Sequence, residues 1–213
     1  EAEARPILAA YGIAQPRAAL ARSAEEAGRL AAEIGFPAAL KIVSPDIFHK
    51  SEVGGIALRL GDETAVQDAF EAMIARVLER QPNARIEGAL VTQMARPGHE
   101  LIVGMRRDPQ FGPLLMAGLG GIYVELLKDV AFRVAPFSRA EALAMIGETH
   151  AGKLLAGLRG QPPADVEAVA EVIERVAQLA LDHPRIQEID INPLLVYPAG
   201  QGALAVDVRM VLG

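Results

Sequence analysis

Short strand-like runs alternate with helix-like segments along the whole chain, and glycine or proline stands at most of the junctions. Ala38–Val43 and Ile56–Leu60 are apolar runs of strand length, whereas Val66, Phe70, Met73 and Val77 recur at helical spacing. Most strand-like runs are joined to the next by short polar turns, which suit antiparallel neighbours. The sequence therefore predicts an α+β fold with largely antiparallel sheets, not an alternating doubly wound parallel sheet.

The same patterns predict the individual elements. Two Ser-x-x-Glu capping boxes, at Ser23 and Ser138, mark helix starts, and Asp62 is a further N-cap. Helices are expected over 4–11, 23–34, from 62 onward, from 138 onward and over 166–181. Strands are expected over 38–43, 56–60, 86–94, 100–105, 113–117, 130–134, 188–196 and 203–208.

Composition excludes several classes of protein. The chain has 213 residues, no cysteine and a formal net charge of −6, so a disulfide framework, a thiolate metal site and the basic surface of a nucleic-acid binder are not expected. No apolar run approaches the ~20 residues of a membrane span, and no signal peptide is visible. We expect a cytoplasmic protein without nucleic-acid or membrane partners. We interpret the chain as an excised domain or a processed chain, because it begins at Glu1 without a Met and enters a helical pattern almost at once.

The first candidate site is the segment Lys41–Gly55. Lys41 stands in an otherwise apolar strand, and a buried lysine needs an anionic partner. His49 and Lys50 precede Gly54-Gly55, and glycines let backbone amides approach phosphate oxygens closely. The alternative is a surface loop with Lys41 reaching water. The spacing does not match a Walker loop.

The second candidate site is the C-terminal hairpin. Glu188, Asp190 and Asn192 alternate with isoleucines, which places their side chains on one face of a strand. Asp207 is expected on the partner strand between two valines. Carboxylate and amide oxygens arranged in this way suit Mg²⁺, although a solvated strand face is the alternative for Glu188.

Two weaker signals remain. Gly118, Gly120 and Gly121, with Glu125 downstream, form a second glycine-rich segment, which alone indicates only a flexible turn. Glu87 and Glu100 lie on either side of the expected boundary between two lobes, where Glu100 can accept hydrogen bonds from sugar hydroxyls or can be an exposed edge carboxylate.

These motifs, taken in order, resemble one family. Lys41–Gly55, Asp108-Pro109-Gln110-Phe111-Gly112-Pro113, Gly118–Gly121 with Glu125, and Asp190-Ile191-Asn192-Pro193-Leu194 followed by Asp207 are similar to the ATP-grasp part of nucleoside-diphosphate-forming acyl-CoA synthetases. The resemblance covers nearly the whole chain. It implies two α/β lobes with nucleotide between them, which we place at 1–90 for the small lobe and 91–213 for the large lobe.

The resemblance also implies roles for particular residues. Lys41 matches the phosphate-binding lysine, Lys50 lies beside the phosphates, and Val53, Gly54 and Gly55 match a mobile loop over them. The strand Ala89, Leu90, Val91, Thr92 matches the hinge that meets the adenine through backbone groups, with Glu87 nearby and Glu100 as the ribose carboxylate. Asn192 and Asp207, with Asp190 near them, match the Mg²⁺ ligands, and the glycine segment is a further phosphate-loop candidate.

His49 is the implied catalytic residue. In the family a histidine in this loop is a second phosphorylation site that carries phosphate between the nucleotide and a histidine on the CoA-binding part. An imidazole nitrogen suits that role because it is a good phosphoryl nucleophile near neutral pH. The implied reaction is acyl-CoA + ADP + phosphate ⇌ acid + CoA + ATP, with Mg²⁺ as cofactor.

The implied partner is a CoA-binding region, either on the same parent chain or on a separate alpha-type subunit, because the sequence contains no such region. Two alternatives stay open. One is a regulatory, synthetase-like nucleotide-binding module of a protein acetyltransferase. The other is a different ATP-grasp ligase that works through an acyl-phosphate without a phosphohistidine.

Overall fold

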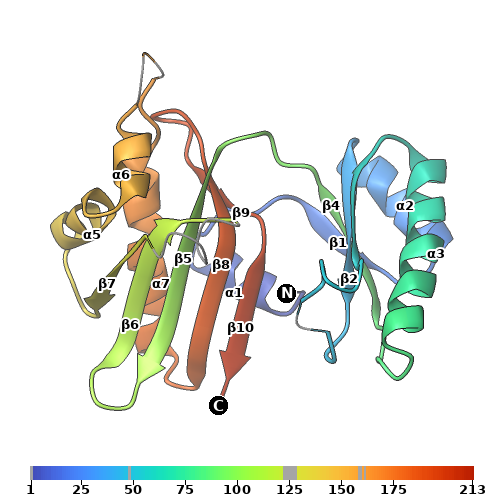
Figure 1. The fold of residues 1–213 in the computed structure, drawn as a ribbon, viewed down its shortest axis with the longest axis horizontal. Coiled ribbons are helices and arrows are strands. Elements are labelled where there is room, and N and C mark those ends of the chain that lie inside the picture. Colours follow the sequence, from blue (N-terminus) through green and yellow to red (C-terminus); the bar gives the residue numbers. More distant parts are fainter. Residues whose placement is uncertain (1, 48, 122–128, 158–159, 161) are drawn as a thin grey trace. The chain divides into compact units, whose positions relative to one another are not determined.

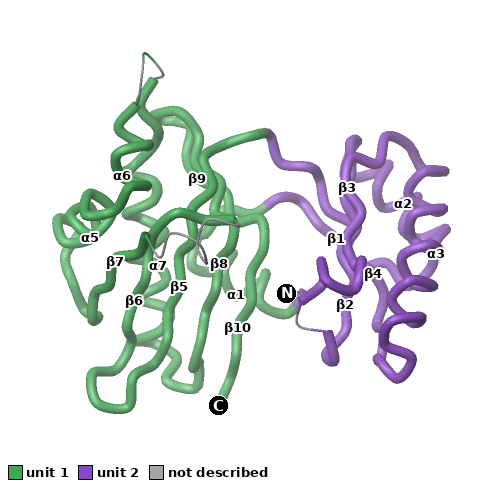
Figure 2. Tube along the Cα trace, viewed as in Figure 1, with its two compact units in different colours: residues 1, 3–15, 97–213 green, residues 2, 16–96 purple. Residues whose placement is uncertain are grey.

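The computed structural model describes residues 2–47, 49–121, 129–157, 160 and 162–213, and it divides into two compact units (Figures 1 and 2). Unit 1 contains residues 3–15 and 97–213, and unit 2 contains residues 16–96. The sequence analysis placed a single boundary between the lobes, after residue 90, whereas the units of the structure divide after residues 15 and 96. The two divisions differ because β4 (Gly88–Gln93) is an inner strand of unit 2, and because α1 (Ala4–Ala10) packs in unit 1 beside β10 (Val208–Leu212).

Unit 2 is a four-stranded antiparallel sheet with two helices on one face (Figure 1). The strands lie in the order β1 (Ala18–Ala21), β4, β2 (Ala38–Val43) and β3 (Ile56–Leu60). Helices α2 (Ala24–Ile34) and α3 (Glu63–Arg80) begin at the predicted caps, since the side chains of Ser23 and Asp62 accept hydrogen bonds from Glu26 N and Ala65 N. The sequence analysis missed β1, whose four residues carry no β-branched or aromatic side chain.

Alternation along the strands of unit 2 separates a helix-covered face from a helix-free face. Leu40, Ile42 and Val91 belong to the core that packs under α2 and α3. Lys41 and Leu90, which lie opposite each other in the β2–β4 pair, therefore point to the face away from the helices.

Unit 1 contains a larger antiparallel sheet with its helices on one face. The strands run in the order β10, β8 (Ile186–Val196), β5 (His99–Asp108), β6 (Gly112–Leu119) and β7 (Val130–Val134), and the short β9 (Ala203–Ala205) pairs with β8. Among the described residues of unit 1 the helices are α1, α5 (Arg139–Gly147), α6 (His150–Leu155) and α7 (Val166–Asp182). The predicted capping box at Ser138 is confirmed, because Ser138 and Glu141 satisfy each other's backbone N–H groups.

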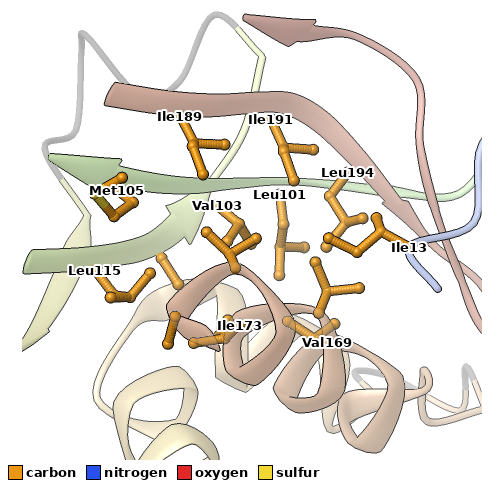
Figure 3. Close-up of a cluster of buried hydrophobic side chains, with 14 of the residues drawn as sticks. Ile13, Leu101, Val103, Met105, Leu115, Val169, Ile173, Ile189, Ile191 and Leu194 are labelled. Carbon is orange, nitrogen blue, oxygen red and sulfur yellow. The ribbon is translucent and has the colours of Figure 1, made fainter. Parts of the chain in front are cut away.

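The core of unit 1 lies between the sheet and α7. Figure 3 shows Leu101, Val103, Ile189 and Ile191 pointing from the strands toward Val169 and Ile173 of that helix. Glu100, Gly104, Asp190 and Asn192 alternate with these core residues, so they belong to the opposite, helix-free face.

The C-terminal strand differs from the prediction. One strand was expected over 203–208, but the structure has β9 and β10 with a break at Val206 and Asp207. The break remains attached to β8, since Val206 N donates to Pro193 O (3.0 Å) and Asn192 N donates to Asp207 O (3.2 Å). No helix in the described part of the chain combines the length and apolar character that a membrane crossing requires.

Candidate functional site

In unit 2 the candidate residues gather on the helix-free face of the sheet. Lys41 is only 5% exposed and faces Leu90 on one side and Ile56 on the other. Thr92, also buried, lies two residues from Leu90 on the same face. A lysine side chain buried to this extent needs anionic or polar neighbours, so its position favours a binding role over a side chain that reaches water.

The loop between β2 and β3 is held together by turns. Gly55 N donates to Lys50 O (2.7 Å), and Ile42 N donates to Gly55 O (2.8 Å), which closes the loop onto β2. Gly54 has φ +71°, a conformation that favours glycine. Ile47 and Val53 are buried beneath the loop, while His49 is exposed, so its imidazole is accessible from solvent.

The predicted hinge needs a correction. Every residue from Ala89 to Thr92 has a partner on both β1 and β2, because β4 is an inner strand. Backbone N–H and C=O groups of an inner antiparallel strand are taken up by its two neighbours, so this segment has none to offer an adenine. The chain leaves the sheet after β4, over residues 94–96, where Met94 N still donates to Pro37 O (3.1 Å). Glu87, exposed before β4, uses its own backbone N–H on Val43 O.

In unit 1 the predicted metal ligands meet where the sheet is irregular. The β5–β8 register shifts between Leu101 and Val103, so that Asn192 and Pro193 both stand opposite Ile102. Asp207 occupies the break between β9 and β10, beside Asn192. Such bulges re-aim side chains and are common next to active sites. The structure therefore brings Asn192 and Asp207 together, although Asp207 is not in a strand.

Asp190 adds a second carboxyl group to this region. Burial raises the pKa of the Asp190 carboxyl, the nearby Glu188 and Asp207 raise it further, and Arg209 opposes the shift. Asp190 Oδ1 is buried and has no hydrogen-bond partner among the described residues. Glu188 itself pairs with Arg209 at 3.4 Å, which agrees with its interpretation as a strand-surface residue.

The glycine-rich segment packs directly on these residues. Gly120 N donates to Glu100 O (2.9 Å), and Gly121 N donates to the Asn192 side-chain oxygen (3.1 Å). A Cβ on Gly121 would lie 2.5 Å from a Glu100 carboxylate oxygen. The segment thus connects Glu100 to Asn192. Gly118, Gly120 and Gly121 are described, whereas the fourth predicted member, Glu125, lies outside the described residues.

The residues present fit a magnesium ion. The orphaned Asp190 oxygen and the neighbouring carboxylate of Asp207 and amide of Asn192 are hard oxygen donors, which Mg²⁺ prefers. Across the described ranges no three His, Cys, Asp or Glu side chains form a complete cage. Mg²⁺ does not need one, since it usually binds one or two carboxylates together with phosphates and water.

Comparison with known proteins decides the family. The model of the ATP-grasp domain matches residues 1–212. The chain belongs to the ATP-grasp family. Within it, the chain is 48% identical over its whole length to the beta subunit of acetate–CoA ligase [ADP-forming] I from Pyrococcus furiosus, of which it covers 90%. It is therefore an ATP-grasp module of the ADP-forming acyl-CoA synthetase type, as the sequence predicted.

Other relatives place this ATP-grasp module in longer proteins. It is 51% identical to acetate–CoA ligase [ADP-forming] I from Archaeoglobus fulgidus over its full length, but spans only 30% of that protein. Among solved structures, acetyl-coenzyme A synthetase 1 of Ca. Korarchaeum cryptofilum superposes with a TM-score of 0.96 at 47% identity, covering 100% of this chain and 92% of that one. These matches confirm the predicted ATP-grasp fold.

Sequence reasoning missed two features of the ATP-grasp module. One is the backbone beyond β4, which replaces Ala89–Thr92 as the candidate hinge. Recognising it requires knowing that β4 is an inner strand. The other is the contact of Gly121 with Asn192. The sequence analysis found both the glycine segment and the Asn192 motif, but no local pattern can show that two residues 71 positions apart are in contact.

Proposed function

We propose that this ATP-grasp module binds Mg-ADP or Mg-ATP and transfers phosphate between the nucleotide and a histidine. The full reaction of the parent enzyme is acyl-CoA + ADP + phosphate ⇌ acid + CoA + ATP. The observation that carries the proposal is the convergence of Asn192, Asp207 and the glycine segment at one irregularity of the unit 1 sheet. In unit 2, Lys41 is buried on the helix-free face of the sheet and is the candidate phosphate-binding cation that the family resemblance implies.

The solved relatives support this proposal. One structure of the Korarchaeum enzyme is described as containing coenzyme A and Mg-AMPPCP, with its phosphohistidine segment pointing towards the nucleotide binding site. That chain is 43% identical to this one and superposes with a TM-score of 0.86. A magnesium nucleotide analogue and a phosphohistidine segment therefore occur together in that structure.

Each group has a chemical task in the proposed site. The Lys41 ammonium binds phosphate oxygens and offsets their charge, and Glu100 accepts hydrogen bonds from the ribose hydroxyls. Asn192 and Asp207, with Asp190, hold Mg²⁺, which when bound neutralises phosphate charge and orients the transferred group. The segment over residues 94–96 offers backbone groups to the adenine.

His49 is the proposed phosphate carrier. Its imidazole nitrogen attacks the γ-phosphorus of ATP, the bond from that phosphorus to the bridging oxygen breaks, and ADP leaves with the electron pair. The resulting phosphoramidate passes the group to the partner's histidine. Exposure of His49 on a loop suits the transfer, because a rigidly buried group cannot meet a second site.

The partner of this module is inferred from how its relatives are assembled. The relatives include separate beta subunits and fused chains more than three times as long as this module, so a partner region or subunit is expected in either form. We propose that this partner binds CoA and the acyl group. The cytoplasmic location remains a prediction from the sequence.

Isothermal titration calorimetry with ADP tests the nucleotide site. We expect Asp207→Asn to weaken Mg-ADP binding while leaving metal-free ADP binding nearly unchanged. We expect Lys41→Met to weaken the binding of both Mg-ADP and metal-free ADP by about 1.5–3 kcal/mol, the value of a charge-assisted hydrogen bond. Asp68→Asn on α3 and Lys153→Met on α6 are matched controls, because both residues are exposed and lie outside the candidate site.

The outcome separates binding from a structural role. Wild-type affinity in Lys41→Met would make the lysine a structural residue. Equal binding of ADP with and without Mg²⁺ would reject the metal assignment of Asn192 and Asp207. Circular dichroism of each variant shows whether a loss of binding reflects a loss of fold.

A further inference from the structure

Asp129 and His150 form a carboxylate–imidazole pair in unit 1 that the proposed function does not use. Asp129 immediately precedes β7, and His150 is the first residue of α6. Asp129 Oδ1 lies 2.8 Å from His150 Nδ1. The same carboxylate accepts hydrogen bonds from the backbone N–H groups of His150 (2.9 Å) and Ala151 (3.1 Å). One aspartate therefore holds both the ring of His150 and the turn that carries it.

This arrangement determines which ring nitrogen carries the proton. Partial burial raises the pKa of the Asp129 carboxyl, but the hydrogen bonds from the His150 backbone and ring and from Ala151 outweigh it, so the pKa lies below its usual range. An ionised carboxylate only accepts hydrogen bonds, so Nδ1 of His150 is the protonated nitrogen. The lone pair of the neutral ring is then on Nε2.

Exposure makes that lone pair available to a reactant. The Asp129 side chain is only 9% exposed, whereas the His150 side chain is 73% exposed. Within the described residues Nε2 has no hydrogen-bond partner. A buried carboxylate behind an exposed imidazole is the arrangement by which enzymes orient a histidine and stabilise the positive charge that develops on its ring.

The pair also lies beside the glycine-rich segment. The Asp129 backbone O accepts a hydrogen bond from Leu119 N (3.3 Å), and a Cβ on Gly118 would overlap the same carbonyl. Gly118–Gly121 continues from there to Glu100 and Asn192. The imidazole is therefore at the same end of β6 and β7 as the segment proposed to contact phosphates.

We propose that His150 Nε2 is a second phosphoryl-accepting nitrogen of this chain, separate from His49. The Nε2 lone pair attacks phosphorus, the N–P bond forms, and the bond from phosphorus to its leaving group breaks with the electron pair on that group. The Nδ1 proton stays in place, and Asp129 offsets the positive charge on the phosphorylated ring. Where the donor is ATP and ADP leaves, the inference rests on the proposed nucleotide site; with a small donor it does not.

Phosphoramidate is the probe that tests the imidazole alone. In this donor the P–N bond breaks and ammonia leaves, with no nucleotide or metal required. We expect mass spectrometry of the whole chain to show labelling of His150 about tenfold faster than of His183, which is also exposed but lies edge-on to the Tyr11 ring. Phosphorus-31 NMR is expected to identify the product as the Nε2 isomer, since Nδ1 carries a proton that is hydrogen-bonded to the Asp129 carboxylate.

Asp129→Asn provides the matched variant. Asparagine keeps an oxygen acceptor for the N–H groups of α6 but removes the negative charge, so labelling of His150 is expected to fall about tenfold, to the level of His183. Circular dichroism confirms that α6 and the fold persist. The proposal is overturned if His150 reacts no faster than His183, if His150 in Asp129→Asn is labelled as fast as in the wild-type chain, or if phosphate is attached to Nδ1.

A parallel arm with Mg-ATP labelled at the γ-phosphate identifies the physiological type of donor. Labelling of His150 from ATP, lost in His150→Gln, supports nucleotide-fed transfer. Labelling from phosphoramidate but not from ATP, in a chain that binds no Mg-ADP by calorimetry, contradicts the proposed nucleotide site and leaves the phosphoryl-accepting imidazole established.

Discussion

Gly120 illustrates how a single position can link fold and function. A Cβ at this residue would lie 2.6 Å from the backbone carbon and oxygen of Leu101, so β5 would have to move to admit any side chain. The glycines of the 118–121 segment therefore have two effects: they let this segment lie against β5, and they bring the backbone N–H of Gly121 to the Asn192 side-chain oxygen.

We expect Gly120→Ala to destabilise the protein by about 1–3 kcal/mol, the usual cost of overpacking. Gly147→Ala is the matched control, because Gly147 ends α5 with no atom within 4 Å of its Cβ position. That substitution is expected to be neutral or to stabilise by up to about 1 kcal/mol. Urea unfolding measures both values, and equal effects of the two substitutions would contradict the close packing of Gly120.

His49 gives the second prediction at this scale. With the CoA-binding region and γ-labelled ATP supplied, the wild-type chain is expected to gain acid-labile, base-stable phosphate that His49→Gln lacks, while Mg-ADP binding is retained. His99→Gln is the control, since His99 pairs with Val196 inside the sheet. Full overall turnover by His49→Gln would exclude the carrier role.

At the scale of elements, α6 depends on a residue outside itself. The helix has six residues, too few to be stable alone. Asp129 accepts hydrogen bonds from its first two backbone N–H groups, and the side chain of the N-cap residue Thr149 accepts one from Gly152 N. Sequence analysis did not predict α6, because its acidic partner lies 21 residues earlier, where no local capping pattern can show it.

We expect Asp129→Ala to cost about 1–2 kcal/mol at neutral pH, as lost helix caps do. The folded-state pKa of Asp129 is lowered, so its stabilising contribution is present above the unfolded pKa and is lost as pH falls through the folded pKa. The difference in unfolding free energy between wild type and variant should therefore shrink on acidification. A difference that stays constant down to acid pH would show that ionised Asp129 contributes nothing; Asp68→Ala, on exposed α3 surface, serves as control.

Elements with strong local signals were predicted correctly, and those with non-local causes were not. The capped helices α2, α3 and α5 and the apolar strand β2 agree with their sequence patterns. The break at Asp207 and the inner position of β4 depend on pairing with β8 and β1, which are distant in sequence. Strand alternation places Asp190 and Asn192 on the helix-free face, whereas Asp207 lies outside the predicted strand. The backbone groups assigned to the adenine are paired with neighbouring strands.

At the scale of the whole molecule, two separate hydrophobic cores underlie the two units. Met73 on α3 is fully buried in the core of unit 2, and Ile173 on α7 is fully buried in the core of unit 1. Substitution of either by alanine is expected to cost about 2–5 kcal/mol in its own core.

Hydrogen exchange shows whether these cores unfold separately. We expect Met73→Ala to speed exchange of the slowest amides in β2 and β4 much more than in β5 and β8, and Ile173→Ala to do the reverse. Equal acceleration across both sheets in either variant would show that the chain unfolds as one cooperative unit.

The division of unit 1 into residues 3–15 and 97–213 has a consequence for synthesis of the chain on the ribosome. Unit 2 is complete once residue 96 has left the exit tunnel, so its sheet can close while the rest is still being translated. The helix α1 is made before unit 2, yet it packs beside β10, which is made after unit 2. Residues 3–15 therefore reach their place in unit 1 only after unit 2 and the later strands have been translated, and a chain that stopped after residue 96 would carry a folded unit 2 without a complete unit 1.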